Sequence, residues 1–139
     1  MKVVVDTNVV VSRFLSPKGP PAQVFHLWED QAFGLVVSQS LLEEYRRALL
    51  YEDVASRHGM SEAEVLEVVA MMERFALVVE PKMTVSVITR DSSDNKFIEC
   101  AMEGGAEFIV SGDSHLLDLG RYEGVEIITP AAFLALFRP

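Results

Sequence analysis

Carboxylate side chains occur along the sequence near the ends of short apolar segments, where folding could bring them together. Asp6 follows the apolar residues 2–5, Asp113 follows the apolar residues 107–110, and Asp94 stands at the start of a helical pattern. Glu44 lies one to two turns into the helical segment that follows residues 33–37. If the apolar segments are parallel strands, their carboxyl ends meet at one edge of a sheet, where such sheets bind ligands. We therefore expect these four acids to converge.

The expected cluster of acids suits a hard divalent cation. Carboxylates held close together repel one another, and a bound cation makes the arrangement tolerable. Oxygen donors without Cys or His ligands favour Mg²⁺ or Mn²⁺ over zinc. The histidines, His26, His58 and His115, lack the spacing of metal ligands, and only His115 is near the acids, where we expect it to be exposed to solvent.

Each acid also has a structural explanation as a helix cap. Asp6 and Asp113 each precede a helical segment and could be its N-cap. Asp91 could cap the segment that begins near Asp94, with Asp94 as an acid in its first turn, near the positive end of the helix dipole. Capping explains any one of these acids well. It explains their joint placement at one sheet edge less well than a shared cation does.

Helix geometry separates Glu43 from Glu44. In the segment 38–50, the apolar residues share one side at about 100° per residue. Glu44 lies on the flank of that side, where a carboxylate can reach the edge of a cleft, and Glu43 lies nearly opposite its centre. We predict that Glu44 is the ligand and that Glu43 is a surface residue.

Short strands alternate with helices along the chain, which is typical of an α/β protein with a parallel sheet covered on both faces. We predict a central sheet of four to five parallel strands flanked by helices, in a single domain over residues 1–139. The predicted strands are 2–5, 33–37, 77–79, 107–110 and 125–129, and the predicted helices are 9–15, 22–30, 38–50, 61–75, 94–103, 113–119 and 130–137. Residues 57–60 are predicted as a flexible turn, and residues 81–93 show no clear periodicity.

The composition sets limits on the function. The 139 residues carry a formal net charge of −9, which argues against gripping nucleic acid by overall charge and predicts a basic surface on any partner protein. No apolar segment approaches the roughly 20 residues that a membrane span needs, and the N-terminal apolar stretch is too short for a signal peptide. The single Cys100 suits a reducing compartment. We therefore expect a cytoplasmic protein without a membrane partner.

The motifs, taken together, resemble those of PIN domains. The resemblance rests on Val-Val-Val-Asp6-Thr-Asn8, on Ser38 with Glu44 in the next helix, on Asp91-Ser-Ser-Asp94-Asn-Lys-Phe-Ile-Glu-Cys-Ala, and on Glu-Phe-Ile-Val-Ser111-Gly-Asp113-Ser-His-Leu-Leu. Each motif is weak, but the set in this order is specific and spans nearly the whole chain. It looks closest to the VapC-like toxin components of bacterial toxin–antitoxin pairs.

The resemblance implies a three-layer sandwich of helices around a parallel sheet and an endoribonuclease that uses one or two Mg²⁺ or Mn²⁺ ions. It places the catalytic and metal-binding acids at Asp6, Glu44, Asp94 and Asp113. Asn8 and Ser111 match supporting polar positions, and Asp91 matches an additional acid beside the site. RNA as the substrate, an inhibitory antitoxin and a homodimer are implied as partners. Hydrolysis by a metal-activated water would leave a 5′-phosphate and a 3′-hydroxyl.

Substrate binding by an acidic protein must come from local positive charge. The candidates near the expected cleft or its rim are Arg13, Lys18, Arg46, Arg47, Arg90 and Lys96. Lys96 is the most interesting because it lies within one turn of Asp94.

Three other functions compete with the nuclease hypothesis. A non-catalytic partner of the same fold would use the acids as caps and dock a basic protein. A receiver-like signalling domain would accept a phosphoryl group on an aspartate, but it needs paired acids after the first strand, where this chain has Asp6-Thr7-Asn8. A doubly wound phosphatase would need a second Asp at the position of Asn8.

Overall fold

The computed structural model describes residues 1–88 and 92–138 and has a six-stranded sheet in the order β3-β2-β1-β4-β6-β5. The strands are β1 (Lys2–Val5), β2 (Gly34–Ser38), β3 (Leu77–Val79), β4 (Phe108–Val110), β5 (Arg121–Tyr122) and β6 (Val125–Ile128). The helices are α1 (Thr7–Leu15), α2 (Pro20–Glu29), α3 (Gln39–Leu50), α4 (Glu52–His58), α5 (Glu62–Phe75), α6 (Asn95–Gly104), α7 (Ser114–Leu119) and α8 (Pro130–Ala135), with a 3₁₀ turn η1 (Ser92–Asp94) before α6. The predicted α/β class and the parallel sheet are confirmed.

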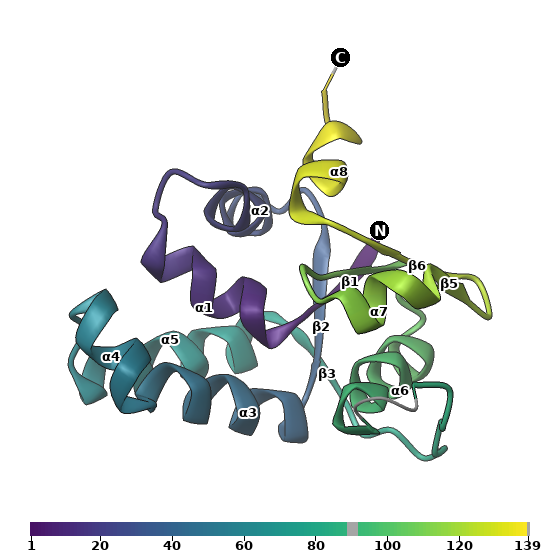
Figure 1. Cartoon of the computed structure of the whole chain (residues 1–139), viewed down its shortest axis with the longest axis horizontal. Helices are drawn as coiled ribbons and strands as arrows, with labels where there is room; N and C mark the ends of the chain where they lie inside the picture. The colour runs from purple at the N-terminus through teal and green to yellow at the C-terminus, as the bar shows by residue number, and fades with distance from the viewer. Residues whose placement is uncertain (89–91, 139) are drawn as a thin grey trace.

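The helices cover both faces of the sheet (Figure 1). Helices α1 to α5 gather on one side of the strands, and α6 lies on the other side, where it contacts β1, β2, β3 and β4. The strand order separates the helices in this way, because the chain moves from β1 towards β3 in one direction and then returns to β4 on the other side of β1. The result is a three-layer sandwich with β1 at its centre.

Strand β1 is the centre of the core because its valines are buried on both faces. Val3, Val4 and Val5 are all fully buried, as is usual for strands covered on both sides. The strand pairs in parallel with β2 on one side and with β4 on the other, where Val5 lies opposite Val110. The buried Tyr45 of α3 donates a hydrogen bond from its hydroxyl to the carbonyl oxygen of Val5, at 2.5 Å. The last residue of β1 is therefore held in place immediately before Asp6.

Two elements were not predicted. Strand β5 has only two residues and pairs antiparallel with β6, so its pattern is too short to detect. Helix α4 has no buried residue, so it lacks an apolar stripe, and it occupies part of the segment expected as a flexible turn. Gly59, with a left-handed φ of 70°, ends α4. Helix α5 begins with a capping box, since Ser61 and Glu64 each accept a hydrogen bond from the other's backbone N–H.

Among the described residues, no helix is long and apolar enough to cross a membrane. The lone Cys100 on α6 is fully buried. Burial raises the pKa of its thiol to about 12, although a hydrogen bond with Ser38 acts in the opposite direction.

Candidate functional site

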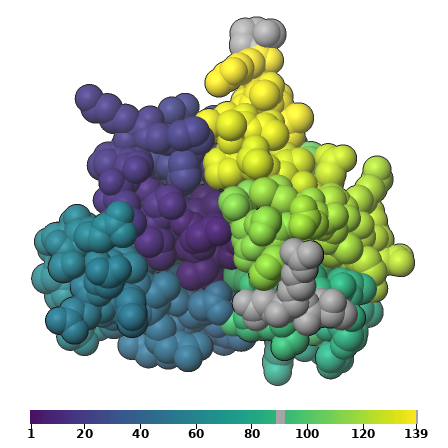
Figure 2. All heavy atoms as spheres, in the orientation of Figure 1, coloured from purple at the N-terminus to yellow at the C-terminus, as the bar shows by residue number. Residues whose placement is uncertain are grey.

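Strands β1 and β4 form the topological switch point of the sheet, and polar residues follow both of them. From β1 the chain crosses to β2 on one side, whereas β4 continues to β6 on the other side. Asp6 follows β1 and Ser111 follows β4, and both are buried. Figure 2 shows the start of the chain (purple) meeting the surface of residues near 110–120 (green), with α3 (blue) below. Open α/β sheets bind their ligands at this kind of crevice.

Ser111 connects two of the predicted acids. Its hydroxyl donates a hydrogen bond to Asp6 Oδ2 at 2.6 Å and accepts one from the backbone N–H of Asp113 at 2.9 Å. The backbone N–H of Asp6 donates to the carbonyl oxygen of Val110 at 2.9 Å. Asp6 is thus fixed by both the backbone and the side chains that follow β4.

The environment of Asp6 opposes its ionised form. Burial is the main cause that raises the pKa of its carboxyl group, and with the smaller contributions of the negative charges of Asp113 and Glu44 the pKa reaches about 6. The hydrogen bonds from Ser111 and from the backbone of Thr7 act in the opposite direction but do not cancel the burial. Asp113 and Glu44 are thus each near enough to Asp6 to act on its carboxyl group electrostatically.

Asp94 and Asp113 approach each other together with His115. Each of the three offers a ligand atom, and these atoms lie within 4.8 Å of one another. Asp94 is buried, whereas Asp113 and His115 are partly exposed. A cation bound among them could therefore also contact solvent or a substrate. Carboxylate oxygens and an imidazole nitrogen fit Mn²⁺ well, and the carboxylates fit Mg²⁺, so the donor set agrees with a divalent ion.

Glu44 lies beside Asp6 but has partners of its own. Its Oε2 accepts a hydrogen bond from the Thr7 hydroxyl, and its Oε1 forms an ion pair with the Lys96 ammonium. Glu43, by contrast, is exposed and pairs with Arg46 on the surface of α3. Glu43 is therefore exposed, as expected, whereas Glu44 is partly buried with its carboxylate bound to Thr7 and Lys96.

The helix-cap alternative holds for one of the three aspartates. Asp113 caps α7, because its Oδ1 accepts a hydrogen bond from the backbone N–H of His115 at 2.9 Å. Asp6 and Asp94 occupy the N-cap positions of α1 and α6, but neither side chain makes the capping hydrogen bond. The cap accounts for Asp113 in part and does not account for Asp6. Asp94 lies in the first turn of η1, as the alternative expected, and Asp91, its expected cap, lies outside the described residues.

Of the supporting residues Asn8 and Asp91 that the sequence suggested, the structure describes only Asn8. Asn8 is exposed in the first turn of α1, with its amide nitrogen beside Gly112 in the loop after β4. Asp91 lies outside the described residues. The site therefore contains Asn8 at its rim and Ser111 at its base.

Of the expected positive side chains, Lys96 is the one that the structure shows among the acids. Arg13 forms an ion pair with Glu29 and stacks on Phe14 and Phe25, away from the acids. Arg46 and Arg47 form ion pairs with Glu43 on the surface of α3, and Arg47 Nε lies 3.9 Å from Glu43 Oε1. Lys18 is exposed on the loop before α2, and Arg90 lies outside the described residues.

Sequence reasoning missed the partners that position the acids. Lys96 and His115 were singled out as lying near acids, and Thr7 was not, but only the packing of α3 against α1 and α6 shows which atoms of the acids Thr7 and Lys96 contact. Asn95 was also missed. Its buried side chain accepts hydrogen bonds from the backbone of Val87 and Ile88 and donates to the carbonyl oxygens of Ile88 and Ser92. It thereby anchors the chain on both sides of residues 89–91 next to Asp94.

The fold and the acids together define an α/β protein with an acidic centre, suited to a cation, at the switch point of a parallel sheet. The sequence identifies the family. Residues 2–115 match the PIN domain, and the uncharacterized protein MJ1680 of Methanocaldococcus jannaschii is 31% identical over 119 residues, which are 86% of this chain and 75% of that protein. The chain belongs to the PIN-domain family, whose members are generally metal-dependent nucleases.

Proposed function

We propose that this protein is a metal-dependent endoribonuclease whose catalytic acids are Asp6, Glu44, Asp94 and Asp113. The observation that carries the proposal is the approach of acids from four separate elements to the switch point beside β1. Asp6, buried and surrounded by like charges, makes no capping bond that would explain its position. Asn8, Ser111 and Asp91 are the supporting polar residues in this proposal.

The residues divide the work of the reaction. Asp94 and Asp113, with His115 beside them, would hold the divalent ion, Mg²⁺ or Mn²⁺. When bound, such an ion lowers the pKa of a coordinated water and polarises a phosphoryl oxygen. Ser111 holds the carboxylate of Asp6 at the base of the site and the backbone of Asp113 at its side, so both acids keep their orientation. The partly exposed side chains of Asp113 and His115 leave one side of the cluster open to an RNA backbone.

A cleavage assay with a mixed RNA pool tests the activity. We expect the wild type to cleave in Mg²⁺ or Mn²⁺ and to stop in EDTA, and we expect Asp94→Asn to be inactive. Glu43→Gln is the matched control, because it removes an exposed acid from the helix that carries Glu44. The products should carry 5′-phosphates and 3′-hydroxyls, and 2′,3′-cyclic phosphates would contradict the metal-activated water.

Two other outcomes would favour the competing hypotheses. If the folded wild type binds divalent ions but cleaves no RNA in any of them, the non-catalytic binding partner becomes the better function. If a small phosphodonor labels the chain stably, the receiver-like function does.

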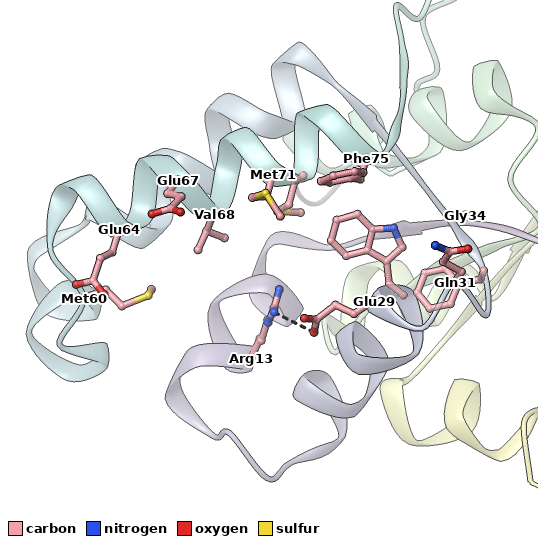
Figure 3. A pocket seen from close by; sticks show the side chains of 13 residues that line it. Arg13, Glu29, Gln31, Gly34, Met60, Glu64, Glu67, Val68, Met71 and Phe75 are labelled. Atoms are coloured by element: carbon pink, nitrogen blue, oxygen red, sulfur yellow. Dashed lines mark hydrogen bonds and ion pairs between the residues drawn. The ribbon is translucent and has the colours of Figure 1, made fainter.

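We further propose that the enzyme is the toxin component of a toxin–antitoxin pair and that its partner binds a groove remote from the acids. The groove has a volume of about 730 Å³ and lies between α5 and the helices α1 and α2 (Figure 3). Its apolar lining includes Trp28, Met60, Val68, Met71 and Phe75, and Met71 and Phe75 are 48% and 59% exposed.

The charge of this groove favours a basic partner over a second copy of the chain. Glu29, Glu64 and Glu67 border the apolar lining, and Arg13 is paired with Glu29 (Figure 3). A protein segment with an apolar stripe and flanking Lys or Arg would match both features. Two copies of this chain would bring acidic borders together, so we place the antitoxin here and the expected homodimer contact elsewhere.

Induced expression in a bacterial host tests the toxin role. We expect growth arrest with the wild type and normal growth with Asp94→Asn. Light scattering of the purified chain tests the homodimer.

For the groove, a synthetic amphipathic Lys/Leu helix should bind the wild type and lose most of its affinity for Met71→Glu, whereas a Glu/Leu helix of the same length should not bind. Equal binding of both peptides would overturn the charge argument.

A further inference from the structure

The acids at the switch point fall into two groups with different means of neutralisation. Asp94, Asp113 and His115 present ligand atoms within 4.8 Å of one another. Glu44 is not part of that group, and both of its oxygens have partners, Thr7 on one and Lys96 on the other. Asp6 accepts a hydrogen bond from Ser111 and is influenced by one acid of each group, Asp113 and Glu44.

We propose that Lys96 is a built-in cation that takes the place of a second divalent ion, so that the centre binds one metal ion per chain. The inference rests on the proposed metal-dependent function and specifies how many ions that function uses. In this arrangement Glu44 is the counter-ion of Lys96 and is not a metal ligand. The reaction then has one divalent ion at Asp94 and Asp113 and one fixed ammonium at Glu44.

The position of Lys96 supports this role. It is the second residue of α6, two residues after Asp94, and its side chain crosses from α6 to α3 to reach Glu44. The Lys96 and Glu44 side chains are only 23% and 26% exposed, so water screens their attraction less than it would on an open surface. A cation that took Glu44 as a ligand would have to displace this ammonium or sit beside it, and the two positive charges would repel each other.

Thr7 makes the arrangement geometrically specific. Its hydroxyl donates to the second oxygen of Glu44, and Thr7 directly follows Asp6. Glu44 is thereby held from both sides, and its carboxylate is oriented by α1 and α6 at once. By contrast, the partners of Glu43 on the surface, Arg46 and Arg47, both belong to its own helix α3.

Counting bound Mn²⁺ on the full chain, without RNA, tests the proposal. Titration with Mn²⁺, followed by the electron paramagnetic resonance signal of the free ion, should give one ion per chain for the wild type. Lys96→Met keeps the aliphatic stem and removes the charge, so it should expose Glu44 as a ligand and give two ions per chain. Lys96→Arg keeps the charge and should give one.

Double substitution separates this role from simple packing. Lys96→Met combined with Glu44→Gln should return the count to one, because the anion that would bind the second ion is gone. Glu44→Gln alone should leave the single ion bound, whereas Asp94→Asn should lose it. Circular dichroism should show that each variant is folded.

The outcomes are decisive and independent of ribonuclease activity. A wild type that binds two ions or none, or a folded Lys96→Met that still binds one, overturns the proposal. If the counts agree but RNA is not cleaved, the proposed function fails and the one-ion centre stands.

Discussion

At the scale of single residues, one hydroxyl organises the acidic centre. Ser111 is fully buried and connects Asp6, which follows β1, to the backbone of Asp113, which follows β4. The hydrogen bond to Asp6 joins segments 105 residues apart, and the hydrogen bond from Asp113 lies within the turn that leads into α7. The hydroxyl therefore converts the pairing of two strands into a defined orientation of two carboxylates.

Removing this hydroxyl should impair catalysis more than stability. We expect Ser111→Ala to lower RNA cleavage by roughly 10- to 100-fold, as is usual when a residue that orients a metal site is lost. The fold should lose only about 1 kcal/mol, because one hydrogen bond to a charged group and one to a backbone N–H are removed. Ser114→Ala, an exposed position on α7, is the control. Equal losses in both variants would show that Ser111 has no orienting role.

The raised pKa of Asp6 predicts a cost in stability at neutral pH. The folded protein holds the Asp6 proton up to about pH 6, whereas the unfolded chain releases it near its ordinary value of 3.8. The free energy of unfolding should therefore fall as the pH rises from about 4 to 6, and the cost should be complete above pH 6. A shift of about two pKa units corresponds to about 3 kcal/mol.

Asp6→Asn should remove this cost. In EDTA at pH 8, we expect the variant to be more stable than the wild type by up to about 3 kcal/mol, and the difference should vanish below pH 4. Urea unfolding at several pH values measures it, with Glu126→Gln as an exposed control on β6. A variant less stable than the wild type at pH 8 would show that the ionised carboxylate is favoured by the fold.

At the scale of elements, α6 is the part of the structure that connects the site to the sheet. It contacts β1, β2, β3 and β4, and it can lie so close because Gly104 has no side chain. A Cβ atom on Gly104 would lie well inside contact distance of the Val36 side chain on β2. The close approach of α6 in turn fixes Asp94 and Lys96 at its other end.

Gly104→Ala should therefore destabilise the protein. Overpacking against Val36 costs about 1–3 kcal/mol, which outweighs the better helix propensity of alanine. Val36→Ala makes room, so the double variant should lose less stability than the sum of the two single variants in thermal unfolding. Gly112→Ala is the control, since a Cβ atom there meets its nearest neighbour at 3.9 Å. Additive losses would contradict the steric explanation.

The elements that the sequence revealed were those with a strong local signal. The valines of β1 and β2, the capping box of α5 and the apolar faces of α3 and α6 are local patterns that predict a strand or a helix directly. The acids at the ends of these elements could be located from the same patterns. Strand β5 and helix α4 were missed because one is too short and the other buries nothing. The bonds of Glu44 to Lys96 and of Asn95 to Val87 depend on how elements pack, and no local pattern encodes them.

At the scale of the whole molecule, the net charge of −9 works against RNA binding. In the proposed function, affinity for RNA must come from the metal centre and a few positive side chains, so the protein should neutralise few phosphates. For inactive Asp94→Asn, we expect weak RNA binding whose logarithm falls with the logarithm of salt concentration by a slope no steeper than about −2, since each phosphate contact on a single strand contributes about −0.7. Fluorescence anisotropy at several salt concentrations measures this slope, and a value near −5 would reveal a basic surface that the structure does not show among its described residues.

The buried thiol of Cys100 can serve as a chemical probe of how often helix α6 separates from the sheet. It lies on α6 against the sheet, and its pKa of about 12 keeps it protonated at neutral pH. An alkylating reagent can reach it only when α6 separates from the strands, so the labelling rate reports how often that separation occurs. Because Asp94 immediately precedes α6 and Lys96 lies in its first turn, the same measurement would show how tightly a bound ion holds the N-terminal end of α6 to its neighbours.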